Sequence, residues 1–386
     1  MDLASSSPAD PILGLLENYA SLNLSTITTL PSLPSPLEFL RFVAQNRPFV
    51  IRGGAADWKA VQEWNVATLK TLLEGVDINV AVTPFGSRLY LSSPIQYTSY
   101  PSTPQYVDMP AANINNTTLR NADSPVLSPS GELLFVKPHE EQQPFSQFLD
   151  FIIAQEKSLS SRSISPSTQP PGGEVRYAQT QNDNLPNEYA LLSTHVPPSI
   201  PFSRIALNSQ PDAVNLWIGN SLSTTALHKD NYENIYVQII GRKTFLLIPP
   251  IAWSAVAERP LRPASYARLA QHSPRHLPGG GFEIVEEAGD PVPFATWDPD
   301  SPLGAEEGNG TRYSKWVEPL RVELREGDML YLPAQWYHKV SQSCSEEGIC
   351  VAVNYWHDME FGGGFWPMCN FVRDVGLAAT SGTGGS

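Results

Sequence analysis

Two histidines and an aspartate, His228, Asp230 and His338, are residue types that bind transition metals. His228 and Asp230 are two positions apart, and such residues project from the same face of a strand, so both can reach one ion. A histidine followed two positions later by Asp or Glu needs further support, because a chain with 7 histidines and 39 acidic residues contains about one such match by chance. A second match, His139-Glu140-Glu141, lies in a segment that we interpret as a loop without a metal role.

The segment around His338 provides that support. Gly327–Pro333 has the composition of a turn followed by an apolar strand, and His338 lies beside another strand. Two histidines and one carboxylate on facing strands form the facial triad of non-haem Fe(II) oxygenases, which leaves coordination positions open for a cosubstrate and O₂. The same three ligands can also form a catalytic zinc site. The structural alternative is a pair of buried histidines hydrogen-bonded to an aspartate.

An oxygenase of this type also needs residues that bind a cosubstrate. A dicarboxylate that chelates iron through its 2-oxo acid end leaves a distal carboxylate, which requires a cation. Lys243 lies between Gly241 and the apolar run Phe245–Ile248, where a buried lysine needs a partner. Other polar residues that can face the same cavity are Thr225, Tyr177, Asn234 and Asn354. The alternatives are a surface lysine in a hairpin, an ordinary strand threonine, and polar core residues bonded to the backbone.

Short strands must position these residues. Strand-like runs separated by turn residues predominate from about residue 175 onward, which favours a barrel or sandwich over alternating βαβ units. We predict a β-hairpin that turns at Gly241-Arg242, so that the strand beginning at Lys243 pairs back toward the His228 segment. The strands expected in this region are Asn234–Ile240, Lys243–Ile248, Arg321–Leu324, Asp328–Leu332, His338–Val340 and Ile349–Trp356.

The rest of the chain frames this strand-rich region. Residues 1–33 are rich in Ser, Pro and Thr and are predicted to form a flexible extension, whereas Ser35, Pro36 and Glu38 have the pattern of a helix N-terminus with a capping box. One domain is expected over 34–375, with a barrel core over about 175–360, a C-terminal helix over about 365–377 and a disordered tail over 378–386. Long loops are expected over 100–132, 158–173 and 255–315.

Composition limits the classes of function. The 386 residues are 41% apolar, and the formal net charge of −14 argues against binding to a nucleic-acid phosphate backbone. No apolar run approaches the roughly 18 residues of a membrane span, and we recognise no N-terminal signal peptide. The 3 cysteines contain no C-x-x-C pair and favour a reducing compartment. We therefore expect a cytoplasmic protein, with the nucleus as the alternative.

Five segments resemble the JmjC hydroxylase family. They are Asn215–Gly219, Leu227–Asn234, Leu330–His338, Ala352–Trp356 and Asp358–Glu360, and the similarity extends from about residue 34 to 375. The resemblance implies a mainly β fold, the double-stranded β-helix (jelly roll) of cupin and JmjC proteins, with flanking α-helices. It implies Fe(II) bound by His228, Asp230 and His338, with 2-oxoglutarate as cosubstrate and O₂ as oxidant. The family's cosubstrate positions match Lys243, Thr225 and Asn234, with Tyr177 and Asn354 as further members.

Within that family the chain resembles the branch that hydroxylates a lysine in translation-associated GTPases. This implies a protein substrate, a developmentally regulated GTP-binding protein. The acidic surplus and the resemblance together make Glu233, Asp358 and Glu360 candidates for binding the substrate ammonium group. JmjC hydroxylases often dimerise through C-terminal helices, so we expect a homodimer through Phe365–Leu377, which is apolar on more than one side.

Three other functions remain open at this point. An N-methyl-lysine demethylase uses the same iron chemistry on a different C–H bond, although we recognise no histone-reader module or zinc cluster in the sequence. A metal-dependent peptidase fits if zinc occupies the site, but it has no need for Lys243. A non-catalytic JmjC binding module is the third alternative, and the intact set of His228, Asp230 and His338 argues against it.

Overall fold

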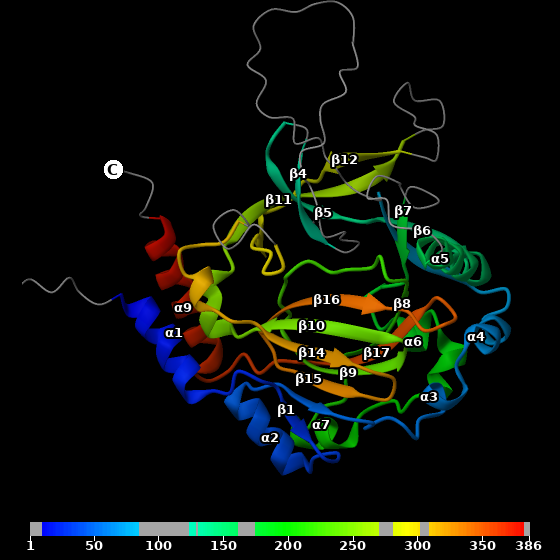
Figure 1. Ribbon diagram of the computed structural model, residues 1–386, viewed down its shortest axis with the longest axis horizontal. Helices are drawn as coiled ribbons and strands as arrows, with labels where there is room; N and C mark the ends of the chain where they lie inside the picture. The colour runs from blue at the N-terminus through cyan, green and yellow to red at the C-terminus, as the bar shows by residue number, and fades with distance from the viewer. Residues whose placement is uncertain are drawn as a thin grey trace, which may run out of the picture.

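Two β-sheets face each other at the centre of the protein, whose computed structural model describes residues 10–84, 123–128, 130–160, 174–269, 281–301 and 309–381 (Figure 1). One sheet has six strands in the order β1-β2-β15-β9-β17-β8, and the other has three in the order β14-β10-β16. Tyr236 and Ala352 of the first sheet share an apolar cluster with Phe245 and Val340 of the second. The predicted jelly-roll fold with flanking helices is confirmed.

The strands of the six-stranded sheet are β1 (Thr28–Leu30), β2 (Phe49–Ile51), β15 (Met329–Leu332), β9 (Tyr232–Ile240), β17 (Cys350–Asp358) and β8 (Ala213–Gly219). Those of the three-stranded sheet are β14 (Leu320–Leu324), β10 (Arg242–Ile248) and β16 (Tyr337–Ser343). A third sheet contains β12 (Phe282–Glu286), β11 (Glu258–Arg268), β5 (Leu133–Lys137) and β4 (Ser124–Leu127), and β13 (Val292–Ala295) pairs with β11. A fourth sheet contains β6 (His139–Pro144), β3 (Asp77–Pro84) and β7 (Glu174–Tyr177).

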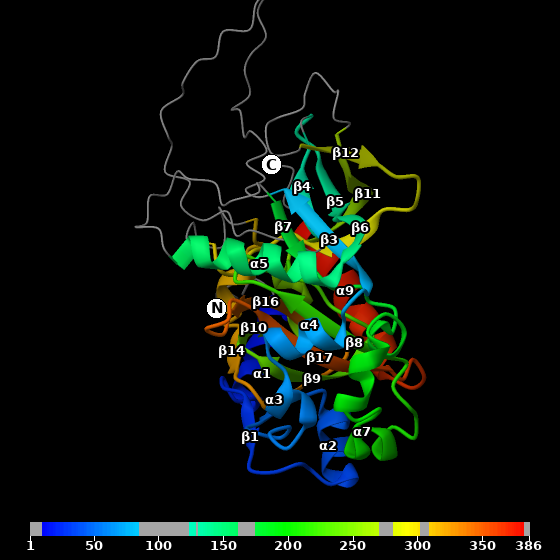
Figure 2. The ribbon, with the colours of Figure 1, turned by 90° about the vertical axis from the view of Figure 1, so that its right-hand side faces the viewer.

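The helices cover the outside of these sheets. They are α1 (Pro11–Leu22), α2 (Pro36–Gln45), α3 (Lys59–Glu63), α4 (Val66–Leu72), α5 (Phe145–Ser160), α6 (Asn184–Asn187), α7 (Pro201–Ala206) and α9 (Phe365–Ser381), with short 3-10 helices η1 (Ala190–His195), η2 (Pro250–Ala255) and η3 (Ser314–Trp316). The capping box predicted at Ser35 and Glu38 is confirmed. Helix α5 packs on the sheet β6-β3-β7, and α9 packs on η2 (Figure 2). No helix among the described residues is long and apolar enough to span a membrane.

The hairpin predicted around Gly241 is wrong. Strands β9 and β10 belong to different sheets, because β9 pairs with β15 and β17 whereas β10 pairs with β14 and β16. Each strand therefore has both of its hydrogen-bonding edges occupied, and the chain crosses from one sheet to the other at Gly241. This residue has a φ of +74°, and a Cβ atom there would lie 2.7 Å from the carbonyl oxygen of Ser343, so a glycine is required.

The flexible extension predicted over 1–33 is also wrong for residues 10–33. Asp10 caps helix α1, whose Ile12 and Leu16 are buried in the same cluster as Trp253 of η2. Strand β1 pairs in parallel with β2 and so extends the six-stranded sheet. Residues 10–33 are therefore joined to the domain through helix α1 and strand β1.

The loops predicted over 100–132 and 255–315 contain strands. The second range includes β11, β12 and β13, and the described end of the first includes β4, which pairs with β5. Strand β11 contains Pro260 and Pro263. Proline is rare in strands, because it lacks a backbone N–H, and this explains why the sequence pattern predicts a loop here. His139 likewise begins strand β6 rather than lying in a loop. Residues 85–122, and residues 161–173 of the loop predicted over 158–173, lie outside the described part of the chain.

Helix α9 differs from its prediction in length and packing. It runs to Ser381, four residues beyond the predicted end at Leu377, so the predicted tail over 378–386 is wrong for its first part, and 382–386 lie outside the described residues. Val372 and Val375 pack on the cluster of η2, and Gly376 lies so close to Trp253 that a Cβ atom would be 2.6 Å from the indole. One face of the helix thus docks on its own chain.

Beside these docked residues α9 also exposes apolar side chains, from which we propose that the protein forms the predicted homodimer. Phe365, Met368 and Phe371 are 36%, 59% and 61% exposed. We expect a dimer by light scattering and a monomer after Phe371→Glu, because a charge there would be buried without a partner in the interface. Leu191→Glu, at a 57% exposed leucine of η1, is the matched control and should leave the dimer intact. A monomeric wild-type protein would contradict the proposal.

Candidate metal centre and adjoining cavity

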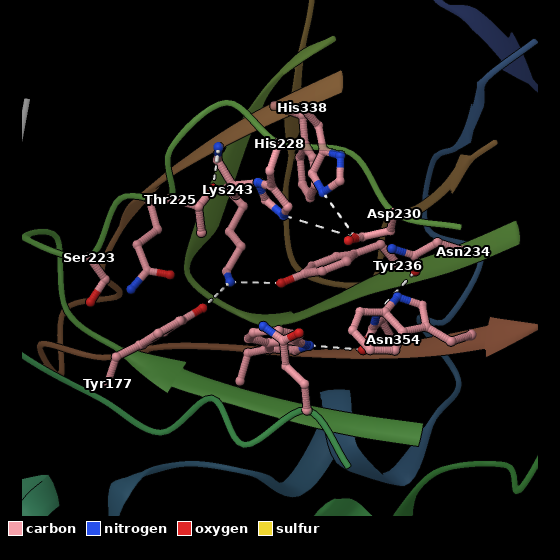
Figure 3. Close-up of a pocket in the computed structure, with 16 residues that line it drawn as sticks. Tyr177, Ser223, Thr225, His228, Asp230, Asn234, Tyr236, Lys243, His338 and Asn354 are labelled. Atoms are coloured by element: carbon pink, nitrogen blue, oxygen red, sulfur yellow. Dashed lines mark hydrogen bonds and ion pairs between the residues drawn. The ribbon is translucent and has the colours of Figure 1, made fainter. Parts of the chain in front are cut away.

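The two predicted histidine ligands are joined through their backbones. His228 lies in the segment before β9, and its amide donates to the carbonyl of His338 at 3.1 Å, while the amide of His338 donates back at 2.7 Å. The imidazole centroids are 4.2 Å apart. Asp230 then places its Oδ2 atom 3.6 Å from Nε2 of His338 and 4.0 Å from Nε2 of His228 (Figure 3). One potential ligand atom from each residue lies within 4.8 Å of the others.

Both imidazole rings are held with Nε2 directed toward Asp230. Nδ1 of His228 lies 2.8 Å from the carbonyl of Ala226, and Nδ1 of His338 lies 3.1 Å from the carbonyl of Trp336. A carbonyl oxygen only accepts hydrogen bonds, so each Nδ1 carries a proton, and Nε2 is the atom that a neutral imidazole would offer to a metal. Burial, together with His228, lowers the pKa of His338 to about 4, so this imidazole is neutral at pH 7. Backbone carbonyls commonly fix metal-binding histidines in this way.

These donors fit a divalent transition metal. Two neutral imidazole nitrogens and one carboxylate are the ligand types of non-haem Fe(II) sites, and they also suit zinc. The three residues are close enough for one ligand atom of each to bind the same ion. The donor set alone therefore defines a metal site without selecting the metal, and the selection depends on what lies beside it.

A buried ammonium group lies beside this centre. Lys243 is 2% exposed, and its Nζ atom donates to the phenol oxygens of Tyr177 at 2.9 Å and Tyr236 at 2.7 Å (Figure 3). Within the described part of the chain, no carboxylate pairs with this lysine. Burial lowers its pKa to about 8. An ammonium group buried without a counter-charge is costly, so the site is suited to receive an anion.

The two phenols beside Lys243 add hydrogen-bond donors. Burial raises the pKa of Tyr177 and of Tyr236 well above the usual value, so both stay protonated at neutral pH. Their oxygens accept from Lys243, and each O–H remains available to donate. The ammonium and two hydroxyl groups thus converge on one position, which has the geometry of a carboxylate site.

The other predicted cosubstrate residues line the same cavity. Thr225 is held by its hydroxyl, which accepts from the amide of Val340 at 3.0 Å. Asn354 donates to Asn234 at 3.2 Å and accepts from the indole of Trp217 at 2.9 Å. The structure therefore brings Thr225, Tyr177, Asn234, Lys243 and Asn354 together with His228, Asp230 and His338 around one cavity (Figure 3).

Four polar residues of the cavity were missed from the sequence, namely Gln181, Ser223, Tyr236 and Gln342. Tyr236 is two positions after Asn234 on β9 and shares its face, so the period-two rule could have identified it. Ser223 has a buried hydroxyl with no hydrogen-bond partner among the described atoms, and only the tertiary structure reveals this. Gly219 allows both Ser223 and Tyr177 to approach, since a Cβ atom at this position would lie 2.5 Å from Tyr177 and 2.7 Å from Ser223.

The three acidic residues predicted to bind substrate lie elsewhere. Glu233 points to the other face of β9, where its buried carboxylate accepts from the Tyr331 hydroxyl at 2.6 Å and from the Ala334 amide at 3.3 Å. Its predicted role is wrong, because alternate residues of a strand face opposite sides and Asn234 is the one that faces the cavity. Asp358 and Glu360 are exposed. They line neither the cavity described above nor a second cavity that adjoins the metal centre.

A buried glutamate connects the neighbours of the candidate ligands. Glu258 accepts from the hydroxyl of Tyr337, next to His338, at 2.9 Å, and lies 3.6 Å from the ammonium of Lys229, between His228 and Asp230. Arg373 of α9 donates to the same carboxylate at 2.7 Å. Burial acts to raise the pKa of Glu258, but Lys229, Arg373 and Tyr337 outweigh it, so the net pKa is lowered. Glu258 therefore stays charged and holds both ligand segments against α9.

Comparison with known proteins identifies similar chains. Residues 35–363 match the family described as "Cupin-like domain". The human protein named "Bifunctional peptidase and (3S)-lysyl hydroxylase JMJD7" is 33% identical over 330 residues, which cover 85% of this chain and 83% of that protein. "Lysine-specific demethylase JMJ32" of Arabidopsis thaliana is 29% identical, over 92% of this chain and 88% of its own. "JmjC domain-containing protein E" of Dictyostelium discoideum is 27% identical, over 85% and 83%.

We predict that Asp230→Ala weakens metal binding by more than about tenfold, because it removes one of three donors. Titration with Mn(II), followed by electron paramagnetic resonance, measures the affinity, and circular dichroism checks that the fold is retained. His139→Ala is the matched control. It changes the histidine of the second match, His139-Glu140-Glu141 on β6, which is assigned no metal role. Equal Mn(II) affinities for the wild type and Asp230→Ala would refute the assignment of the metal site.

Proposed function

The chain belongs to the JmjC oxygenases of the cupin-like family, and from this we propose that it is a protein lysyl hydroxylase dependent on Fe(II) and 2-oxoglutarate. The observation that carries the proposal is the buried ammonium of Lys243 beside the cluster of His228, Asp230 and His338. A metal site and an anion site in one cavity match the two ends of a 2-oxo dicarboxylic acid.

Each cavity residue has a proposed role. His228, Asp230 and His338 would hold Fe(II), which with 2-oxoglutarate and O₂ supplies an oxidation strong enough for an unactivated C–H bond. One oxygen atom enters the substrate and the other enters succinate, with release of CO₂. Lys243, Tyr177 and Tyr236 bind the distal carboxylate of 2-oxoglutarate, and Thr225 offers its hydroxyl hydrogen to the same ligand. Asn234 and Asn354 hold each other and Trp217 along the cavity wall.

The anion site supports an oxygenase over a metal-dependent peptidase. A hydrolase activates water on the metal and needs no cation for a distal carboxylate. Here Lys243 is kept buried at a cost in desolvation, and its nearest partners are neutral phenols. Such an arrangement has an evident use only when an anionic ligand enters the cavity.

The choice between hydroxylation and demethylation depends on which C–H bond reaches the metal. The relative at 33% identity bears the name of a lysyl hydroxylase, and the relative at 29% bears that of a demethylase. We propose hydroxylation of an unmodified lysine in a developmentally regulated GTP-binding protein, and we propose that the reaction takes place in the cytoplasm. The excess of negative charge would speed encounter with a basic segment of that partner.

We predict that Lys243→Ala weakens 2-oxoglutarate binding by more than tenfold, because removing one partner of a buried charge pair costs about 2–5 kcal/mol. Wild-type affinity should fall as the pH rises through about 8, where the Lys243 ammonium loses its proton, by up to about tenfold per pH unit. Calorimetric titration of the Mn(II)-loaded protein measures both effects. Lys243→Ala has no ammonium to titrate and should lack this pH dependence. Parallel pH profiles for the two proteins would exclude Lys243 as the carboxylate partner.

We predict that the enzyme adds 16 mass units to a lysine of developmentally regulated GTP-binding protein peptides incubated with Fe(II), ascorbate and 2-oxoglutarate. Mass spectrometry detects the product, and Asp230→Ala is the inactive control. Loss of 14 mass units from methyl-lysine peptides, without hydroxylation of unmodified lysine, would favour the demethylase. Cosubstrate consumption with neither product would leave an oxygenase with a different class of substrate.

A further inference from the structure

A second cavity adjoins the metal centre on the side of the third sheet. It shares Gln181, Trp217, Thr225, His228 and Asp230 with the first cavity. Its remaining walls include Phe135 of β5 and the four residues of β13. Strand β5 lies above the central sandwich in Figure 1. A side chain that enters this cavity therefore reaches His228 and Asp230 without passing Lys243, so the second cavity is the natural entrance for a protein substrate.

The acidic side chains of this second cavity differ in their pairing. Asp230 faces the two histidines, and Glu258 pairs with the cations of Arg373 and Lys229 and accepts from Tyr337. Asp123, immediately before β4, has no hydrogen bond or ion pair with any described residue. Within the described part of the chain it is thus the carboxylate of this cavity that lacks a cation.

Asp123 lines the same cavity as His228 and Asp230 and is partly buried. Burial raises the pKa of its carboxyl group, and the charge of Lys137 acts in the opposite direction. A carboxylate in such a place is stabilised by a cation, which a ligand can bring.

Part of the wall of the second cavity is apolar. The rings of Phe135 and Phe294 lie 5.2 Å apart, centroid to centroid, and Val292 and Ala295 continue the same surface. Lysine side chains bury their methylene groups on apolar surfaces and extend the ammonium to a polar partner. The second cavity offers both parts of that arrangement.

We propose that Asp123 binds the ammonium group of the substrate lysine while Phe135 and Phe294 contact its methylene groups, which sets the specificity for an unmodified primary amine. The inference rests on the proposed function and names the group that recognises the substrate. With the ammonium held at Asp123, a methylene carbon of the lysine faces His228 and Asp230. Methylation removes N–H donors from the ammonium and so weakens this contact.

Binding of n-pentylamine and its neutral counterpart 1-pentanol tests the proposal without assuming a peptide sequence. Ligand proton relaxation is measured at pH 7 with protein loaded with Mn(II) and 2-oxoglutarate in the absence of O₂. We expect the amine to bind at least about tenfold more tightly to the wild type than the alcohol, in line with a charged hydrogen bond. In Asp123→Asn the preference should fall below about threefold, and Asp123→Glu should restore part of it.

Two further variants separate the contact from general effects. Glu140→Gln removes a negative charge that acts on Asp123 but does not line the second cavity, so it should keep the amine preference. Phe294→Ala should weaken the amine and the alcohol alike. Circular dichroism checks each variant for folding.

The outcomes distinguish this inference from the proposed function. Loss of the amine preference in Asp123→Asn, retained in Glu140→Gln, supports it. An unchanged preference in Asp123→Asn, or none in the wild type, overturns it even if lysine peptides are hydroxylated. If the preference depends on Asp123 but no lysine gains 16 mass units, amine recognition stands and the proposed reaction fails.

Discussion

Two backbone hydrogen bonds between His228 and His338 determine the geometry of the candidate metal centre. They join the segment before β9 to strand β16, which lies in the other sheet from β9. Because each imidazole is also tied through Nδ1 to a carbonyl two residues earlier, the rings have little freedom to turn away from Asp230. The ligand positions thus follow from backbone pairing, which is more rigid than side-chain packing alone.

Contacts on two sides hold the paired backbone segments of His228 and His338 in place. Glu258 contacts Lys229 and Tyr337, the neighbours of the candidate ligands, and reaches α9 through Arg373. On the other side, the crossing at Gly241 moves the chain from β9 into β10 and places Lys243 opposite Tyr177 and Tyr236. A hairpin at that point would have left both strands in one sheet and the lysine without its phenol partners.

The buried charged groups of the two cavities indicate which ligands each cavity can bind. The ammonium group of Lys243 can be stabilised by an anion in the first cavity, and the carboxylate of Asp123 by a cation in the second. The candidate metal centre adjoins both cavities. Opposite charges at separate ends of one site orient a dicarboxylate and an amine without competition between them. Glu233 was predicted from the sequence to bind substrate. Its carboxylate instead accepts hydrogen bonds from Tyr331 and Ala334 in the protein core.

The sequence by itself determined the jelly-roll class, the cluster of His228, Asp230 and His338, and the cavity residues that alternate along strands, because these follow from local periodicity and from family segments that stand intact. It did not determine which strands pair. The sheet assignment of β10, the strands hidden in 255–315, the packing of residues 10–33 and the inward face of Glu233 depend on contacts between distant segments. Asp123 illustrates the limit: nothing in its neighbourhood along the chain marks it, and only the approach of β4, β5 and β13 to the metal centre places its carboxylate there.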